Sequence, residues 1–137
     1  MILFHFETDF NLNKKQKIKE WIKKCILSEG FLVGDINFVF CNDKFLIERN
    51  IQFLNHNSLT DIITFNNSED KTLSADILIS VERVKENSIT FTNNFLEELN
   101  RVMIHGILHL IGYNDKTEKQ KEEMREKENI YISKVVI

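Results

Sequence analysis

The feature that most limits the fold of this chain is a change from strand-like to helix-like segments near Thr90. Runs rich in β-branched and aromatic residues, which are typical of strands, come before this point at Ile2–Glu7, Ile36–Cys41, Asp61–Phe65 and Asp76–Val81. Helical spacing predicts two helices between the first three strands: one from Asn11 or Asn13 to about Ser28, which Gly30 ends, and one from Asn42 or Asp43 to about Leu54. The polar segment 66–74 is predicted to be a turn region.

Two further helices are predicted in the C-terminal third. Asn94 with Glu97 resembles a capping box, and the helix that it opens should run to Ile111, where Gly112 ends it. A second capping box opens a charged helix from Thr117 to about Val135. The order β-α-β-α-β-β-α-α predicts an α+β fold in a single domain of residues 1–137, with a mixed sheet of about four strands and helices over at least one face.

Composition agrees with a globular chain of ordinary domain size. The 137 residues are 42% hydrophobic and 28% charged, which excludes a disordered or fibrous protein. No apolar run approaches the roughly 20 residues that span a bilayer, and the N-terminal segment MILFHFETDF lacks the features of a signal peptide. We therefore expect a cytoplasmic protein without membrane contact. Cys25 and Cys41 have no metal-site spacing and are expected to be reduced and buried.

The segment HGILHLIGYND, from His105 to Asp115, carries the chain's candidate chemistry. On a helix, residues four apart project from one face with Cβ atoms about 6 Å apart, so His105 and His109 can hold one ion. Gly112 lets the chain turn back, which brings the carboxylate of Asp115 toward the same ion. Two imidazoles and one carboxylate leave a fourth tetrahedral position for water, which is typical of catalytic rather than structural zinc.

Spacing alone leaves a second interpretation open, in which the two histidines are an ordinary core or surface pair. Gly106 favours a functional site, because a glycine inside a helix costs about 1 kcal/mol relative to alanine and close approach of a substrate or another backbone would explain it. Gly106 also stands where the HExxH metalloproteases have glutamate, so this chain lacks the general base of that peptidase class. Hydrolysis of a peptide or of a small phosphoester is therefore a weaker alternative.

Four segments resemble motifs of the YbeY endoribonucleases. HGILHLIGYND is similar to the family signature HGxLHLxGYDH, and the other three are TDIITF at Thr60–Phe65, ADILIS at Ala75–Ser80 and ELNRVMIHG at Glu98–Gly106. TDIITF looks like the family strand TxVLSF, and ADILIS looks like the family strand GDIxIS. ELNRVMIHG looks like the family's lead-in to the histidine helix. The resemblance covers most of the chain from about Arg49 to Asp115.

The resemblance implies a zincin-like fold and one Zn²⁺ ion, with His105 and His109 as the first two ligands. Asp115 falls where the family motif has a third histidine, and a carboxylate is a competent zinc ligand. The implied activity is a zinc-dependent, single-strand-specific endoribonuclease of ribosomal RNA maturation at the small-subunit 3′ end and of ribosome quality control. The implied partners are ribosomal RNA, other single-stranded RNA and the small ribosomal subunit, without DNA. The alternative is a ribosome-associated RNA-binding factor whose metal is largely structural.

Candidates for RNA contact are less specific. By position in the family strand, Thr60, Asp61 and Thr64 are expected in the cleft, although ordinary strand and cap chemistry would also explain them. The arginine that many members carry before this strand falls on Leu54, and the nearest substitutes are His56 and Arg49. The segment Lys14–Lys24, with six lysines and one glutamate, is either a phosphate-binding patch or the solvated face of a helix. The mixed charges of the last helix indicate a solvated face, and the net charge of −3 argues against bulk attraction to nucleic acid.

Overall fold

The computed structural model describes residues 1–54 and 60–135. Its elements follow in the order β1 (Ile2–Phe6), α1 (Lys15–Ser28), β2 (Leu32–Cys41), α2 (Asp43–Leu54), β3 (Ile62–Asn66), β4 (Thr72–Ser80), α3 (Val81–Thr90), α4 (Phe95–Ile111) and α5 (Glu118–Ile132). The predicted α+β class with a four-stranded mixed sheet is confirmed. Within the described ranges, none of the helices is long and apolar enough to cross a membrane.

The four strands form one sheet in the order β1-β2-β4-β3. Strands β1, β2 and β4 are parallel, so each needs a crossover connection, and α1 supplies the first of these between β1 and β2. Strand β3 runs antiparallel to β4, with Ile63 opposite Leu78, and forms one edge of the sheet. Helix α4 (Phe95–Ile111), which carries the histidines, contacts both the antiparallel edge strand β3 and its neighbour β4.

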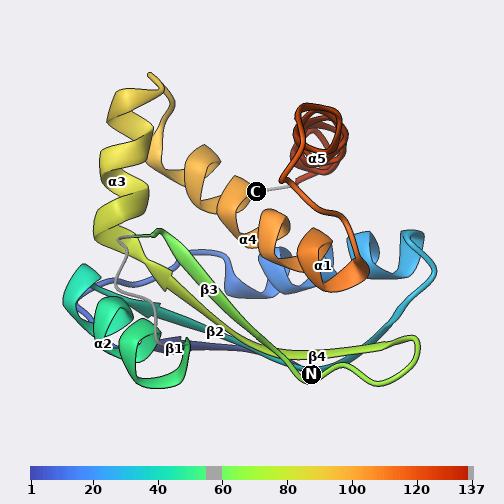
Figure 1. Ribbon diagram of the computed structural model, residues 1–137, viewed down its shortest axis with the longest axis horizontal. Helices are drawn as coiled ribbons and strands as arrows, with labels where there is room; N and C mark the ends of the chain where they lie inside the picture. The colour runs from blue at the N-terminus through green and yellow to red at the C-terminus, as the bar shows by residue number, and fades with distance from the viewer. Residues whose placement is uncertain (55–59, 136–137) are drawn as a thin grey trace.

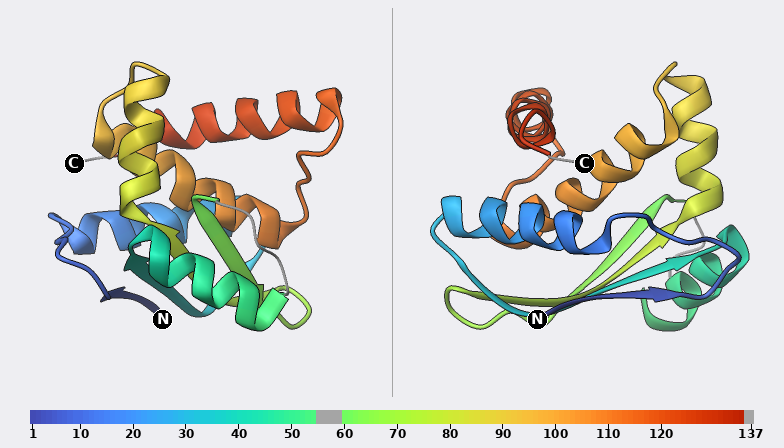
Figure 2. Two further views of the ribbon diagram at one scale, coloured as in Figure 1. Left: turned by 60° about the vertical axis from the view of Figure 1, so that its left-hand side comes forward. Right: turned by 180° about the vertical axis from the view of Figure 1, so that it is seen from behind.

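The helices lie in layers on the two faces of the sheet. Helices α1 and α4 cover one face, and α2 lies against the opposite face (Figure 1). Helix α5 packs on α4 and is farther from the sheet than α4 is (Figure 2). Helix α4 is therefore enclosed between the sheet and α5, and a side chain on its flank can lie at the junction of three elements.

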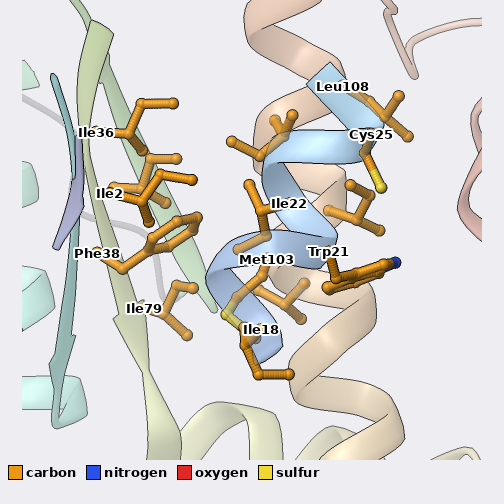
Figure 3. Close-up of a cluster of buried hydrophobic side chains, with 14 of the residues drawn as sticks. Ile2, Ile18, Trp21, Ile22, Cys25, Ile36, Phe38, Ile79, Met103 and Leu108 are labelled. Carbon is orange, nitrogen blue, oxygen red and sulfur yellow. The ribbon is translucent and has the colours of Figure 1, made fainter. Parts of the chain in front are cut away.

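The main core fills the space between the sheet, α1 and α4 (Figure 3). The side chains that it draws together are Ile2, Ile36, Phe38 and Ile79 from the sheet, Ile18, Trp21, Ile22 and Cys25 from α1, and Met103 and Leu108 from α4, each at most 6% exposed. Burying an aliphatic or aromatic side chain of this size contributes about 1.5–3 kcal/mol. This packing fixes the position of α4 over the sheet.

Helices α4 and α5 begin as predicted. The side chain of Asn94 accepts a hydrogen bond from the backbone N–H of Glu97 at 2.8 Å. Thr117 and Gln120 form a complete capping box, in which each side chain accepts from the other residue's backbone N–H. These bonds satisfy N–H groups that the first helical turn leaves without partners.

Three boundaries differ from the prediction. Helix α1 starts at Lys15, after Lys14 in a left-handed conformation with φ 55°, and neither predicted asparagine caps it. Strands β2 and β4 start earlier than expected, since Leu32 pairs with Thr72. Residues 72–74 therefore belong to a strand and not to the predicted turn, because pairing between the two strands overrides their polar sequence.

Helix α3 was not predicted. Val81 was expected to end a strand, but the side chain of Ser80 accepts a hydrogen bond from the N–H of Arg83 and caps a new helix at this point. Within this helix only Val84 and Ser88 are buried, and its β-branched apolar residues Val81, Val84 and Ile89 are as typical of a strand as of a helix.

The two cysteines are free and buried, as predicted. Cys25 belongs to the main core and Cys41 to a smaller cluster with Leu46, Ile63 and Leu78. Burial raises the pKa of both thiols to about 12, so both remain protonated and act as small apolar side chains.

Candidate metal centre

The end of α4 reverses the chain. Gly112 has φ 123°, and its N–H donates to the carbonyl of His109 at 3.1 Å, while the N–H of Tyr113 donates to the carbonyl of Leu108 at 3.0 Å. These two bonds form a Schellman motif, which requires the positive φ that glycine adopts without steric cost. The following residues turn back along the helix and place Asp115 beside its histidine face, as the sequence predicted.

His105, His109 and Asp115 converge at this reversal. The Oδ2 atom of Asp115 lies 3.4 Å from Nε2 of each histidine. One ligand atom from each residue lies within 4.8 Å of the others, and the two imidazole rings stand 4.6 Å apart at 77°. The side chains are 23%, 33% and 41% exposed respectively, so the cluster is half-buried and open to solvent on one side.

Glu128 on α5 holds the first of these histidines. Its Oε2 atom accepts a hydrogen bond from Nδ1 of His105 at 2.7 Å, which leaves Nε2 free to face the cluster. Its other oxygen accepts from Arg101 at 2.9 Å, and Arg101 also donates to Asn129. A carboxylate in this position orients a metal-binding imidazole and raises its basicity.

Sequence reasoning missed Glu128 because it stands in a run of alternating charges. The available signal was its spacing, since Glu128 shares the buried face of α5 with Met124 and Tyr131. A glutamate on the buried face of a charged helix needs a partner on the neighbouring element. Here that partner is a histidine of α4.

His105 and Glu128 each stabilise the charged form of the other. Burial alone would lower the pKa of His105, but the hydrogen bond and the charge of Glu128 outweigh burial, so the pKa is raised. Burial alone would raise the pKa of Glu128, but the hydrogen bonds from His105 and Arg101 outweigh it, so that pKa is lowered. Glu128 is therefore a carboxylate that supports positive charge on the imidazole or beside it.

The donor set fits a divalent zinc ion. Ligand atoms about 2.0–2.1 Å from a tetrahedral zinc lie about 3.4 Å from one another, and the two Asp115–histidine distances are 3.4 Å. Two imidazole nitrogens and one carboxylate oxygen are a common donor set for zinc with an exchangeable fourth position. Among the residues that the structure describes, this trio is the group of histidine, cysteine and acidic side chains that could hold a metal ion.

The residues predicted for RNA contact lie beside this cluster. A hollow of about 500 Å³ runs along β3 and is lined by Thr60, Asp61 and Thr64 together with the three candidate ligands. Asn87 of α3 donates to Asp61 at 3.3 Å, and burial raises the pKa of Asp61 above its usual value. The structure therefore brings these three residues to the centre, while their contact with RNA stays a prediction.

The packing around Gly106 gives a reason for the glycine other than the close approach of a substrate or of another backbone. A Cβ atom at this position would lie 2.8 Å from Cδ1 of Ile62 on β3 and 3.5 Å from Cγ2 of Ile77 on β4. The glycine therefore accommodates the isoleucine side chains of β3 and β4 that pack against α4 at this point. The close packing brings β3, and with it the hollow, against the histidine face of α4.

The other basic candidates lie elsewhere. Arg49 is on α2, where its guanidinium lies 4.3 Å from the centre of the Phe45 ring, on the face of the sheet opposite α4 (Figure 1). His56 lies outside the described residues, and Leu54 is the last residue of α2. The lysines of Lys14–Lys24 do not line the hollow along β3.

Comparisons with known proteins agree with the motif resemblance. The family model described as Endoribonuclease YbeY matches residues 4–136. Curated proteins named Endoribonuclease YbeY are similar over nearly the whole chain. The protein from Christiangramia forsetii is 51% identical over 96% of this chain and 92% of its own. The protein from Flavobacterium johnsoniae is 46% identical over 97% of this chain and 96% of its own.

The fold is also similar to a known structure. The solution structure of TM1509 from Thermotoga maritima superposes with a TM-score of 0.68 at 30% sequence identity, and the match covers 98% of this chain and 89% of that one. The family resemblance of the sequence motifs is thus confirmed by the family model, the relatives and the fold. The chain belongs to the endoribonuclease YbeY family.

Proposed function

We propose that this protein is a zinc-dependent endoribonuclease that cleaves single-stranded RNA during ribosomal RNA maturation. The observation that carries the proposal is the convergence of His105, His109 and Asp115, with two donor separations of 3.4 Å. The family membership supplies the RNA-cleaving activity. We extend the proposal to a cytoplasmic single domain that acts with the small ribosomal subunit, on the 3′ end of its RNA and in ribosome quality control.

Each residue of the centre has a role in this proposal. A bound zinc ion supplies a Lewis acid for the phosphoryl group and lowers the pKa of a water molecule toward about 7. His105, His109 and Asp115 hold the ion, and Glu128 keeps Nε2 of His105 directed toward it. Thr60 and Asp61 line the adjoining hollow, where they can donate to or accept from the ribose and phosphate of the substrate.

The number of protein donors favours catalysis over a purely structural metal. Structural zinc sites are closed by four protein ligands, whereas catalytic sites use three and leave one position for water or substrate. In the described part of the chain, three donors converge. The half-buried cluster also opens into the hollow along β3, which gives a substrate access to the fourth position.

The test measures bound metal and RNA cleavage in the same preparations. We expect the wild-type protein to bind one zinc ion and to cleave single-stranded RNA in preference to duplex. His109→Ala and Asp115→Ala should lose both properties. His5→Ala and Asp9→Ala are matched controls, because both residues are exposed and lie outside the centre.

Three outcomes would contradict the proposal. Metal bound by the wild-type protein without RNA cleavage would favour the RNA-binding alternative. Unchanged metal content in Asp115→Ala would remove Asp115 from the ligand set. Cleavage that persists at the wild-type rate in His109→Ala would show that the observed cleavage does not depend on the candidate centre.

A further inference from the structure

A second hollow leaves the candidate centre in another direction. It encloses about 580 Å³ between α4 and α5, and it shares Asp61, Ile62, His105 and Asp115 with the hollow along β3. Beyond these shared residues its lining includes Arg101 and Val102 of α4, Lys121 and Arg125 of α5, and Phe91 and Asn93 of the segment between α3 and α4. The centre therefore lies where two hollows meet.

The accessible charges of this α4–α5 cleft are positive away from the centre. Lys121 and Arg125 are exposed, and Lys121 makes a solvent-exposed contact of 3.6 Å with Glu118. The acidic side chains of the cleft floor, Glu98 and Glu128, are 6% and 5% exposed, and the latter is paired with Arg101. The other acids of the cleft, Asp61 and Asp115, belong to the part that it shares at the candidate centre, so Lys121 and Arg125 are its exposed charged side chains beyond the centre.

The charge is segregated around α5. The exposed glutamates of this helix, which are Glu118, Glu122, Glu123 and Glu126, do not line the cleft. Lys121 and Arg125 line the cleft, whereas these four glutamates and the exposed Lys119 of the same helix do not. Lysine and arginine side chains that line a cleft can neutralise the phosphates of an RNA backbone.

An aromatic ring stands at the end of the cleft far from the centre. Phe91 is 61% exposed and lines the cleft just before the N-terminal end of α4. At about 1.5 Å of rise per residue, α4 extends about 15 Å from Phe95 to His105. An exposed phenylalanine next to the far end of α4 is an available surface for stacking by an unpaired base.

We propose that the α4–α5 cleft binds a segment of single-stranded RNA next to the cleaved bond, with Arg125 and Lys121 on its phosphates and Phe91 stacked on a base. The inference rests on the proposed function and adds the path of the strand and the residues that bind it. Single-stranded RNA fits this cleft because its bases are free to stack on an aromatic ring, whereas the bases of a duplex are not.

The test uses charge-matched and size-matched pairs of variants. Arg125→Glu is compared with Lys119→Glu, since Lys119 is an exposed cation of the same helix outside the cleft. Phe91→Ala is compared with Ile89→Ala, whose side chain is 67% exposed and outside the cleft. Arg125→Gln serves as a milder variant, and circular dichroism checks that each variant is folded.

Binding of a fluorescein-labelled, unstructured oligoribonucleotide is measured by anisotropy at several salt concentrations. We expect Phe91→Ala to bind about 5- to 150-fold more weakly, the range for loss of one stacked base. For Arg125→Gln and Arg125→Glu, the slope of log affinity against log salt should become shallower by about 0.7 for each phosphate that the variant no longer neutralises. The two control variants should bind as the wild type does.

Cleavage kinetics on the same oligonucleotide separate this inference from the proposed function. We expect a raised KM in the Arg125 and Phe91 variants with unchanged zinc content. If the Arg125 and Phe91 variants cleave RNA with the wild-type KM, the proposed strand path is wrong and the proposed function is unaffected. Binding that depends on both residues without wild-type cleavage would support the path and contradict the nuclease. Equal affinity for duplex and single strand would overturn the role of Phe91.

Discussion

Glu128 accepts a hydrogen bond from Nδ1 of His105 at 2.7 Å, across the interface between α5 and α4. The bond fixes which ring nitrogen faces Asp115, and Arg101 holds the carboxylate in place from its other side. The geometry of the candidate metal centre therefore depends on a residue that does not face the metal.

We predict that Glu128→Gln weakens zinc binding by about 10- to 100-fold, because the neutral amide no longer raises the basicity of the imidazole. The affinity is measured by competition with a zinc-binding dye. Glu126→Gln is the control, since Glu126 is exposed on the same helix. Equal zinc affinity of Glu128→Gln and wild type would show that the bond serves the fold alone.

Removal of the metal should lower stability. An ion that binds the folded protein at 100 times its Kd raises the free energy of unfolding by about 2.7 kcal/mol. We expect thermal unfolding of the wild-type protein to shift upward with zinc and back with a chelator. His109→Ala should show no shift, and His5→Ala should behave as the wild type. A zinc-dependent shift of equal size in His109→Ala would contradict the proposed ligand set.

A second network makes stability depend on pH. The carboxylate of Glu29 accepts hydrogen bonds from Tyr113, Tyr131 and Lys127 and so ties the end of α1 to α5 and to the segment after α4. Burial alone would raise the pKa of Glu29, but these hydrogen bonds outweigh it, so the pKa is lowered. The stabilisation is therefore present above the usual glutamate pKa of about 4.3 and is lost as the pH falls through the lower value of the folded state.

We predict that Glu29→Gln lowers the free energy of unfolding at about pH 7 and that this difference from wild type shrinks as the pH falls below about 4.3. Urea denaturation at a series of pH values measures the difference. Glu20→Gln, an exposed residue of α1, should show little effect at any pH. If the difference in free energy of unfolding between Glu29→Gln and wild type grows as the pH falls, the prediction is wrong.

The position of α4 can be tested with two leucines of the same helix. Leu99 is 0% exposed and Leu96 is 49% exposed. Leu99→Ala should cost about 2–5 kcal/mol of stability, because it removes buried apolar surface and leaves a cavity. Leu96→Ala should change stability by no more than about 0.5 kcal/mol. Similar costs in urea denaturation would contradict the packing of α4.

The parts of the fold that are encoded locally could be predicted from the sequence. The cap at Asn94, the glycine that ends α4 and the return of Asp115 to the histidine face each depend on a few neighbouring residues. Local chemistry of this kind is the same in a peptide as in a protein. The three candidate metal ligands, His105, His109 and Asp115, could therefore be predicted from one short segment.

The parts that depend on distant packing could not be predicted. Helix α3 buries only Val84 and Ser88 and carries β-branched residues that are typical of strands, and the early ends of β2 and β4 are held by each other across the sheet. Glu128 meets His105 only after α5 has folded back on α4. For the strand ends and for Glu128 the partner is far away in sequence, and a local pattern contains no information about it.

Helix α5 packs on α4 and buries three of its own residues, Met124, Glu128 and Tyr131. A helix held by so few side chains opens at a lower free energy than the core does. Because one of the three supports His105, each opening of α5 withdraws that support. We therefore expect loss of the ion and local unfolding of α5 to be linked equilibria, so that bound metal slows hydrogen exchange along the helix and opening of the helix shortens the residence time of the metal.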